Sequence, residues 1–488
     1  MRYRQVEPPS PYSGSLYGAQ TPKPPDGSPE LSANVLEPRE FPFPIIDPHD
    51  QKKPMAEFND IATVLRHRGR SQAKNQAFII LDSKGKEIGS VTWDKLASRA
   101  EKVAQVIKDK SGLYRGDRVA LVYRDTEIID FAVALFGCFI AGVTAVPINH
   151  QDDYQELNYI LNSTQAHLAL TTDNNLKAFQ RDLAIQKLAW PRGVEWWKTN
   201  EFGSFHAKRK GEESFTAADL AYIEFSRSPT GELRGVVMSH MTIMHQMACL
   251  AAVIASSPKK DDDSKRDSYG DARIRPTSLL GEILLTYLDC RMGIGLILSV
   301  LQGVYGGFTT IWSVQASVTV PGLWAHLITR YKATLLLGDY PGLKTVAYNY
   351  QYDPMVTRNF SKRHPVDFSS LRLVMIECIS SDPEFHEILA DRWLRPLGNL
   401  RAREIVAPML CLPEHGGMVV VMRDWLGGED HMMPSWDGNP DDVDRKELKE
   451  LLLDKEALKT NDVVVVAMVQ SSANDELMST GRRSQTTG

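Results

Sequence analysis

The chain has 488 residues, which is too long for one compact core and predicts two to four domains or subdomains. Hydrophobic residues make up 43% and charged residues 24%, which is ordinary for a soluble globular protein. The net charge of -5 leaves no basic surplus to displace counterions from nucleic acid, so nucleic-acid binding is not expected as a main role. The five cysteines are scattered without metal-binding spacing, so we expect reduced, buried thiols in a cytoplasmic protein.

The first residues and two apolar stretches are the parts of the sequence that could act as a secretory signal or as membrane spans. Residues 1 to about 55 are rich in proline, which predicts a disordered or extended leader without the apolar core of a secretory signal. The apolar stretch 128–148 contains Asp130 and Pro147, and the stretch 292–312 contains five glycines. Buried units of helix and strand explain both better than membrane spans, so no transmembrane segment is expected.

From residue 56 onward, helical and strand-like patterns alternate. Helices are expected at 56–65, 92–108, 127–141, 154–163, 241–254 and 341–348. Strands are expected at 77–81, 116–123, 143–148, 166–171, 309–312, 333–337 and 368–376. Strands that alternate with helices through short loops predict a mostly parallel, helix-covered sheet, so the fold class is α/β.

The stretch 220–240 carries the clearest candidate site. A strand-like run at 220–225 leads into a Ser/Thr/Gly turn, then to Arg234 and a second β-branched run. Turn hydroxyls and backbone N–H groups can bind phosphate oxygens while a nearby cation neutralises the remaining charge. The order of parts suggests a nucleotide site; a plain hairpin with a solvated arginine is the alternative.

The same stretch resembles the phosphate loop of the adenylate-forming superfamily, which includes acyl-CoA synthetases, fatty acyl-AMP ligases and peptide-synthetase adenylation domains. The matching residues are Ser226, Thr230, Gly231, Gly235 and Val236, with Arg234 in place of the family's lysine. The residues that depart from the pattern are Arg227, Ser228, Pro229 and Leu233. Pro229 removes one N–H and fixes one φ, so we expect a stiffer loop that wraps phosphate less completely.

Further landmarks follow the family's order. They are Thr92-Trp-Asp-Lys-Leu96, Gly116-Asp-Arg-Val-Ala120 and Val146-Pro-Ile-Asn149. The amino-acid sequence most closely resembles fungal members of the disco-interacting protein 2 family, over about residues 58–468. That resemblance implies the N-terminal domain of an adenylate-forming enzyme, with two helix-covered, mostly parallel sheets and a missing C-terminal lid subdomain. It also implies additional adenylation domains in a parent protein.

The implied organisation has four parts. They are a leader at 1–55, a first α/β subdomain at 56–215, a second at 216–430 that carries the phosphate loop, and a partial, charged end at 431–488.

Several family features are altered. Cys290 and Arg291 precede Met292-Gly293, where active relatives usually place a histidine beside the acyl carboxylate. Glu414 is the best match to the family's magnesium ligand, but the adjoining aromatic residue and glycine are missing, so a solvated loop glutamate is equally open. No C-terminal subdomain with the family's lysine is found.

Two functions therefore stay open. In the first, the chain forms an acyl-adenylate from ATP and a fatty acid or other carboxylate, with magnesium, and coenzyme A as a candidate acceptor. The residues that the resemblance assigns to nucleotide binding are Ser226, Arg227, Ser228, Thr230, Gly231 and Gly235, with Arg234 and Glu414 in the catalytic role. In the second, a degenerate fold binds a nucleotide, lipid or protein without turnover. A thiol enzyme that uses Cys290 or Cys411 lacks a histidine at motif spacing.

Overall fold

The computed structural model describes residues 46–47, 49–148, 153–202, 219–227, 231–256, 281–361, 365–412, 418–421, 469–470 and 477–478. Most of the leader expected at 1–55 lies outside these ranges, as does most of the charged end expected at 431–488.

The first of two large sheets has six strands in the order β10-β9-β6-β5-β7-β8. Its strands are β5 (Arg118–Val122), β6 (Thr144–Ile148), β7 (Leu168–Thr171), β8 (Glu195–Lys198), β9 (Leu220–Arg227) and β10 (Leu233–Ser239). Neighbouring strands are parallel except for the antiparallel β9–β10 hairpin. The strands β5, β6 and β7 are almost entirely buried, which explains their continuous apolar sequences.

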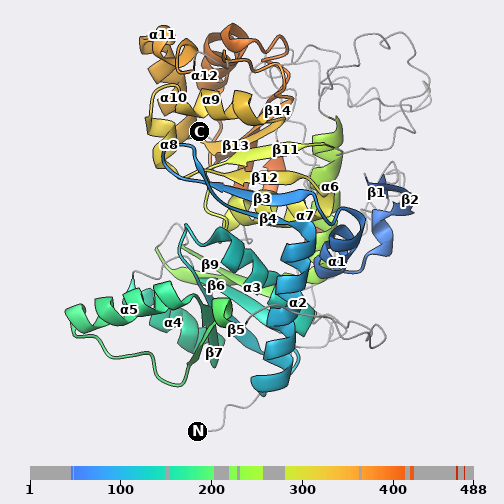
Figure 1. The fold of residues 1–488 in the computed structure, drawn as a ribbon, viewed down its shortest axis with the longest axis vertical. Coiled ribbons are helices and arrows are strands. Elements are labelled where there is room, and N and C mark those ends of the chain that lie inside the picture. The colour runs from blue at the N-terminus through green and yellow to red at the C-terminus, as the bar shows by residue number, and fades with distance from the viewer. Residues whose placement is uncertain are drawn as a thin grey trace, which may run out of the picture. The chain divides into compact units, whose positions relative to one another are not determined.

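The second large sheet has eight strands in the order β16-β15-β14-β13-β11-β12-β3-β4 (Figure 1). Its strands are β3 (Gln76–Leu81), β4 (Glu87–Thr92), β11 (Ile283–Thr286), β12 (Thr309–Trp312), β13 (Leu335–Asp339), β14 (Leu373–Cys378), β15 (Val406–Leu412) and β16 (Met418–Val421). The six inner strands are parallel, and β4 and β16 are antiparallel edges. The prediction of an α/β fold with mostly parallel sheets is confirmed.

Helices follow most of the parallel strands. They are α1 (Ile61–Ser71), α2 (Trp93–Lys110), α3 (Ile128–Ala141), α4 (Tyr154–Thr164), α5 (Asp173–Gln186), α6 (His240–Ser256), α7 (Gln302–Gly306), α8 (Ala316–Thr319), α9 (Leu323–Tyr331), α10 (Tyr340–Tyr352), α11 (Pro354–Arg358) and α12 (Pro383–Leu389). Short helical turns are η2 (Met55–Glu57), η3 (Thr199–Glu201) and η8 (Arg395–Leu397), and π-helical segments are η6 (Gly295–Leu301) and η7 (Ala390–Leu394). Two small two-stranded ladders pair β1 (Ile46–Asp47) with β2 (Asp50–Pro54), and β17 (Val469–Gln470) with β18 (Leu477–Met478).

The assignment of strands to the two sheets does not follow their order along the chain. The strands β3 and β4 precede the six-stranded sheet in sequence but join the eight-stranded one. The β9–β10 hairpin follows residue 215, yet β9 pairs with β6 in the six-stranded sheet. Local periodicity identifies a strand but not its partner, so the sequence alone did not assign these strands to a sheet.

Helix starts follow local capping chemistry. The helix expected from residue 56 begins at Ile61, because the Asp60 side chain accepts a hydrogen bond from the backbone N–H of Thr63. Thr92 occupies the N-cap of α2 as predicted, but its hydroxyl donates to the carboxylate of Asp94 instead of capping the helix.

The apolar segment 293–305 forms η6 and α7, and every residue of both is buried. Its side chains belong to one apolar core that also includes Leu121 and Ala145 from the six-stranded sheet and Leu284 and Leu337 from the eight-stranded sheet. This packing accounts for the apolar sequence. No helix within the described ranges combines the length and the apolar character that a bilayer crossing requires.

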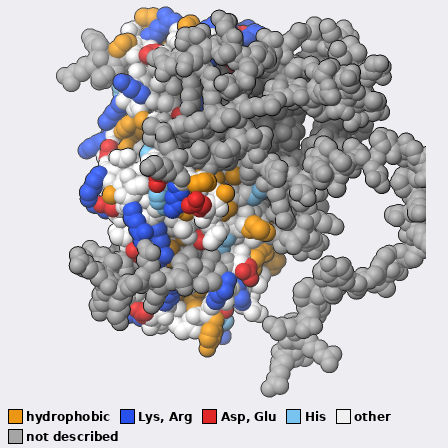
Figure 2. All heavy atoms as spheres, turned by 90° about the vertical axis from the view of Figure 1, so that its right-hand side faces the viewer, with side chains coloured by type: hydrophobic (Ala, Val, Ile, Leu, Met, Phe, Trp, Pro, Cys, Tyr) orange, Lys and Arg blue, Asp and Glu red, His pale blue; other side chains and the backbone are white. Residues whose placement is uncertain are grey.

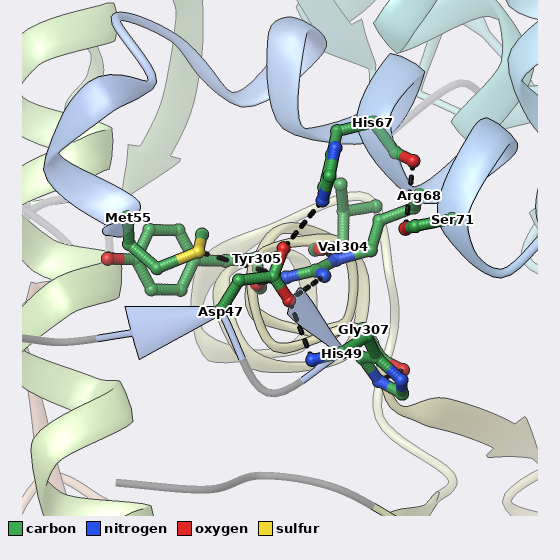
Figure 3. A network of polar contacts seen from close by, with 9 residues as sticks. All are labelled: Asp47, His49, Met55, His67, Arg68, Ser71, Val304, Tyr305 and Gly307. Carbon is green, nitrogen blue, oxygen red and sulfur yellow. Dashed lines mark hydrogen bonds and ion pairs between the residues drawn. The ribbon is translucent and has the colours of Figure 1, made fainter. Parts of the chain in front are cut away.

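A buried ion pair fastens β1 to the helical layer (Figure 3). Asp47 accepts from Nη1 of Arg68 at 2.5 Å and pairs with Nε2 of His67 at 2.7 Å. Arg68 also donates to the carbonyl oxygens of Val304 at 3.1 Å and Tyr305 at 2.6 Å. Because Asp47 and Arg68 are both fully buried, this network holds the entering chain against α1 and α7. We call these four contacts the Asp47–Arg68 latch.

The described surface is mixed in character. Figure 2 shows one face on which basic and acidic side chains are interspersed with small apolar groups. This mixture agrees with a composition of 56 basic and 61 acidic residues.

Candidate active site

The predicted phosphate loop lies in the β9–β10 hairpin. Arg234 lies opposite Ser226 and Gly235 lies opposite Phe225 in the antiparallel register. Gly231 has a φ of +85°, a left-handed conformation that favours glycine, so the turn requires this residue. Ser226 is buried in the strand, whereas Ser228 and Thr230 lie outside the described residues.

The packing of the hairpin explains why residue 235 is a glycine. A Cβ at this position would lie 2.9 Å from the ring of Phe225, so the cross-strand aromatic side chain needs a glycine opposite it. The match of Gly235 to the family pattern therefore has a structural explanation that is independent of any ligand.

The two arginines of the hairpin are exposed and paired. Arg227 donates from Nη1 to the carbonyl oxygen of Gly231 at 2.9 Å and forms an ion pair with Glu156 of α4. Arg234 pairs through Nη2 with Glu232 at 2.8 Å, and its side chain is 57% exposed. The Arg234–Glu232 pair is exposed on both sides and contributes at most about 1 kcal/mol, so the guanidinium of Arg234 can turn toward another anion at little cost. The partner of Arg227 is only 9% exposed, so turning Arg227 away would leave a buried carboxylate without its counter-charge and costs more.

The carboxyl ends of the parallel strands in the eight-stranded sheet carry a second group of polar residues. Tyr287 follows β11, Asp339 ends β13 and Glu377 lies near the end of β14. The hydroxyl of Tyr287 donates to Oδ1 of Asp339 at 2.7 Å. In open α/β sheets, ligands bind in the crevice outside these strand ends.

Two carboxylates meet beside Gly293 at this edge. Glu224 of β9 is 3% exposed, and its Oε1 accepts the backbone N–H of Gly293 at 2.8 Å. A Cβ on Gly293 would lie 4.0 Å from Oε1 of both Glu224 and Glu377. The loop after β11 therefore brings a residue of the hairpin strand and a residue of β14 close to one glycine. We call Glu224 and Glu377 the carboxylate pair.

Burial changes the charge state of this pair. Burial, opposed by the Gly293 N–H and reinforced by the charges of Glu377 and Asp289, raises the pKa of Glu224 to about 7. Burial and the charge of Asp339 raise the pKa of Glu377 to about 7 as well. Both carboxyls therefore change protonation near neutral pH.

Arg291 occupies the turn where the resemblance places a histidine. Its Nε donates to Asp289 at 2.9 Å and its Nη2 does so at 2.6 Å, while Nη1 donates to the carbonyl oxygen of Tyr123 at 2.6 Å. With 8% of its side chain exposed, Arg291 is held by three hydrogen bonds to two partners, Asp289 and Tyr123. It joins the loop of one sheet to the chain after β5 of the other.

The cysteines near this edge are poorly suited to nucleophilic chemistry. Burial raises the pKa of the Cys290 and Cys411 thiols well above the ordinary value. The thiolate is the reactive form, so burial disfavours the thiol-enzyme alternative.

The hairpin brings together five of the predicted site residues, which are Ser226, Arg227, Gly231, Arg234 and Gly235. Glu414, like Ser228 and Thr230, lies outside the described residues. The carboxylate pair and Gly293 were missed. The available signals were a glutamate inside the apolar run 220–225 and another at the end of the apolar strand 373–378.

No set of three or more His, Cys, Asp or Glu side chains suited to a metal occurs in the part of the chain that the structure describes.

Comparisons with known proteins agree with this architecture. The family described as AMP-binding enzyme matches residues 65–405, which is more than half of the chain. An uncharacterized protein of Schizosaccharomyces pombe is 60% identical over 433 residues, covering 88% of this chain and 28% of its own length. The homeostatic regulator of DAG of Saccharomyces cerevisiae is 30% identical, covering 85% of this chain and 25% of its own length.

Human disco-interacting protein 2 homolog B is 27% identical, covering 74% of this chain and 22% of its own length. The chain therefore spans about a quarter of the length of these curated relatives. Among solved structures, fatty acid AMP ligase from Legionella pneumophila aligns with a TM-score of 0.56 at 20% identity, covering 76% of this chain and 57% of that chain. This alignment supports the fold. The chain belongs to the AMP-binding enzyme family and has the α/β fold of the adenylate-forming N-terminal domain.

Proposed function

We propose that this domain binds ATP and a fatty acid or another carboxylate, and joins them as an acyl-adenylate with release of pyrophosphate. The observation that carries the proposal is the β9–β10 hairpin, which has the turn at Gly231 and two exposed arginines. Strand β9 of this hairpin contacts the loop after β11 through the hydrogen bond from Gly293 to Glu224, at the carboxyl ends of the parallel strands. One structural neighbour is a fatty acyl-adenylate ligase from L. pneumophila in complex with acyl adenylate and pyrophosphate. The ligands of that neighbour support the proposed substrate class.

The reaction needs charge neutralisation and positioning more than proton transfer. A carboxylate oxygen attacks the α-phosphorus of ATP, a new P–O bond forms, and the bond to the pyrophosphate leaving group breaks. Arg234 and Arg227 are the described cations of the hairpin, and each would exchange its present carboxylate partner for a phosphate oxygen. Because the Arg234–Glu232 pair is exposed on both sides, its exchange replaces a weak contact by a charge-assisted one, whereas the exchange of Arg227 also uncovers the buried carboxylate of Glu156.

Magnesium is typical of the family, but the described residues do not offer a metal-binding cluster. Glu414, the predicted ligand, lies outside those residues, so no step is assigned to the metal. Coenzyme A as the acyl acceptor and further adenylation domains as partners stay predictions about the longer protein.

The five cysteines are all free and buried, which supports the proposed cytoplasmic location.

A second candidate function is binding of a nucleotide or acyl ligand without turnover. Arg291 favours it, because the residue at the position of the family's histidine is locked to Asp289 and to Tyr123. A relative named as a homeostatic regulator agrees with a binding role.

Calorimetric titration with ATP and magnesium, with and without a medium-chain fatty acid, tests both candidates. Arg234→Ala should weaken binding at least about tenfold, because it removes one charge-assisted contact to phosphate. Arg403→Ala is the matched control, since Arg403 is also exposed and paired with an aspartate, but lies outside the hairpin. It should bind as the unmodified chain does.

Mass spectrometry then separates the two candidates. Acyl-AMP in the reaction mixture supports the first function, and binding without acyl-AMP supports the second. No binding at millimolar nucleotide overturns both.

A further inference from the structure

The two arginines of the β9–β10 hairpin differ in what holds them. Arg234 pairs with Glu232, whose side chain is 66% exposed, so both charges of that pair are in contact with solvent. Arg227 pairs with Glu156 of α4, whose side chain is only 9% exposed. The charge that holds Arg227 is therefore covered by protein, although the Arg227 side chain itself is 53% exposed and open to a ligand.

Glu156 lies in the first turn of α4, and its backbone is fixed by the helix cap. The side chain of Asp153 accepts hydrogen bonds from the backbone N–H groups of Gln155 at 3.0 Å and Glu156 at 3.1 Å. The first turn of a helix favours a negative charge, whereas burial disfavours a carboxylate that lacks a counter-charge. The ion pair of Glu156 with Arg227 is therefore costly to break.

Arg227 connects this carboxylate to the turn of the hairpin. It is the last residue of β9 and lies opposite Leu233 in the antiparallel register. Its Nη1 donates to the carbonyl oxygen of Gly231 at 2.9 Å, while its Nη2 contacts Glu156. Gly231 has the left-handed conformation that shapes the turn, so Arg227 links α4 to the turn itself. We call Glu156, Arg227 and the Gly231 carbonyl group the hairpin clamp.

The clamp makes the two arginines unequal as phosphate ligands. A phosphate that draws Arg227 away leaves the carboxylate of Glu156 buried without this counter-charge. Breaking a buried pair from one side costs much more than separating an exposed pair such as Arg234 with Glu232. The hairpin therefore has one cation that a phosphate recruits readily and one that α4 retains.

We propose that Glu156 retains Arg227 and thereby lowers the affinity of the hairpin for phosphate. The proposal rests on the proposed function, because it concerns the same hairpin and the same nucleotide. On the guanidinium of Arg227, the carboxylate of Glu156 occupies the place that a phosphate oxygen would take. The hairpin clamp is thus an autoinhibitory contact, and Glu156 is a positioning residue that acts through Arg227.

The test measures binding of ATP with magnesium by calorimetric titration. Glu156→Gln keeps the shape of the side chain and removes its charge. It should bind ATP about tenfold more tightly than the unmodified chain, because the released guanidinium adds one charge-assisted contact to phosphate. Glu156→Met is a second neutral variant, with an apolar side chain of similar length, and should show the same gain.

Glu101→Gln is the matched control. It removes the same charge from a glutamate–arginine pair on α2 and α1, in which Glu101 contacts Arg66 at 3.2 Å, outside the hairpin and α4. This variant should bind ATP as the unmodified chain does.

A double variant shows whether Glu156 acts through Arg227. Glu156→Gln combined with Arg227→Gln should lose the gain and bind ATP about as the unmodified chain does. Removal of a carboxylate also lessens its direct repulsion of phosphate, and that effect would persist in the double variant. A gain that persists there overturns the proposal, because Arg227 would not be needed for it. A purely structural role of Glu156 would produce no gain that depends on Arg227.

The negative outcomes separate the proposal from the proposed function. If ATP binds but neither neutral variant binds it more tightly than the unmodified chain, the hairpin clamp does not limit affinity and the proposed function stands. If no variant binds ATP at millimolar concentration, both fall together. Circular dichroism confirms that each variant is folded, and either neutral variant alone suffices for the comparison.

Discussion

The backbone N–H of Gly293 donates a 2.8 Å hydrogen bond to Oε1 of Glu224, and this contact joins the loop after β11 of one sheet to β9 of the other. The contact of Arg291 with the Tyr123 carbonyl oxygen joins the same two sheets at 2.6 Å. The candidate active site is therefore built where the two sheets are held together. A change in either contact therefore alters the candidate active site as well as the packing of the sheets.

The carboxylate pair predicts that stability falls as pH rises. The pKa of Glu224 is raised from 4.5 to about 7 in the folded chain, so the folded state binds a proton that the unfolded state releases first. Glu224→Gln should leave stability nearly unchanged near pH 5 and increase it by up to about 3 kcal/mol near pH 8. Urea unfolding at both pH values measures the difference, with Glu384→Gln as control. A difference that is equal at the two pH values would contradict the raised pKa.

The Asp47–Arg68 latch predicts a large loss of stability when one partner is removed. Both side chains are fully buried, and Asp47→Asn would leave the guanidinium of Arg68 without its counter-charge. Breaking a buried pair from one side costs about 3–5 kcal/mol. Asp94→Asn is the control, because its partner Lys74 is 87% exposed and the expected loss is below about 1 kcal/mol. Denaturant unfolding of both variants checks the contrast, and equal losses would refute it.

The same latch predicts a pH dependence of opposite sign. Burial alone would raise the pKa of Asp47, but Arg68 and the His49 N–H together lower it, so its stabilising contribution is lost as pH falls. Burial lowers the pKa of His49 and His67, so the unfolded chain takes up their protons first as pH falls below about 6.5. The part of the stability deficit of Asp47→Asn that comes from the lowered pKa of Asp47 should therefore shrink only as pH falls below about 4, the ordinary pKa of an aspartate. A deficit that stays constant from about pH 4 to about pH 2 would show that the pKa of Asp47 is not lowered.

Gly295 predicts a steric effect at the start of η6. A Cβ there would lie 1.9 Å from the carbonyl oxygen of Asp289, and backbone atoms cannot move aside as a side chain would. Gly295→Ala should destabilise the chain by about 3 kcal/mol or more. Gly89→Ala is the matched control, since the nearest atom to its Cβ would be 3.7 Å away, an ordinary contact. Thermal or urea unfolding distinguishes them, and a tolerated Gly295→Ala would contradict the close approach.

We expect the five cysteines to react slowly with a thiol reagent in the folded state, because all of them are buried. All five are buried, and burial raises the pKa of Cys378 to about 11. A disulfide reagent such as DTNB should modify the native chain slowly and all five thiols rapidly after denaturation. Rapid modification of Cys290 or Cys411 in the folded chain would restore the thiol-enzyme alternative.

Much of the secondary structure could be predicted because its signals are local. The helix expected at 127–141 is α3, and the strand expected at 309–312 is β12. Periodicity and turn residues act over a few positions, so they can be read without knowing the fold. The strand-turn-strand pattern around Gly231 likewise located the hairpin and its arginines.

The pairing of those elements could not be predicted in the same way. Nothing near Glu224 in sequence shows that Glu377 lies beside the same glycine, and nothing near Arg291 shows that the carbonyl oxygen of Tyr123 accepts its hydrogen bond. These contacts depend on which strands share a sheet and on how the two sheets pack.

The α/β class, the family and the position of the hairpin with Ser226, Arg227, Gly231 and Arg234 could all be inferred from the amino-acid sequence. Only the packed fold shows that a buried glutamate of one sheet and a partly exposed glutamate of the other lie beside Gly293 and change protonation near neutral pH. The physical reason is that propensity and periodicity are properties of neighbouring residues, whereas burial and the field of distant charges arise only when the chain has packed.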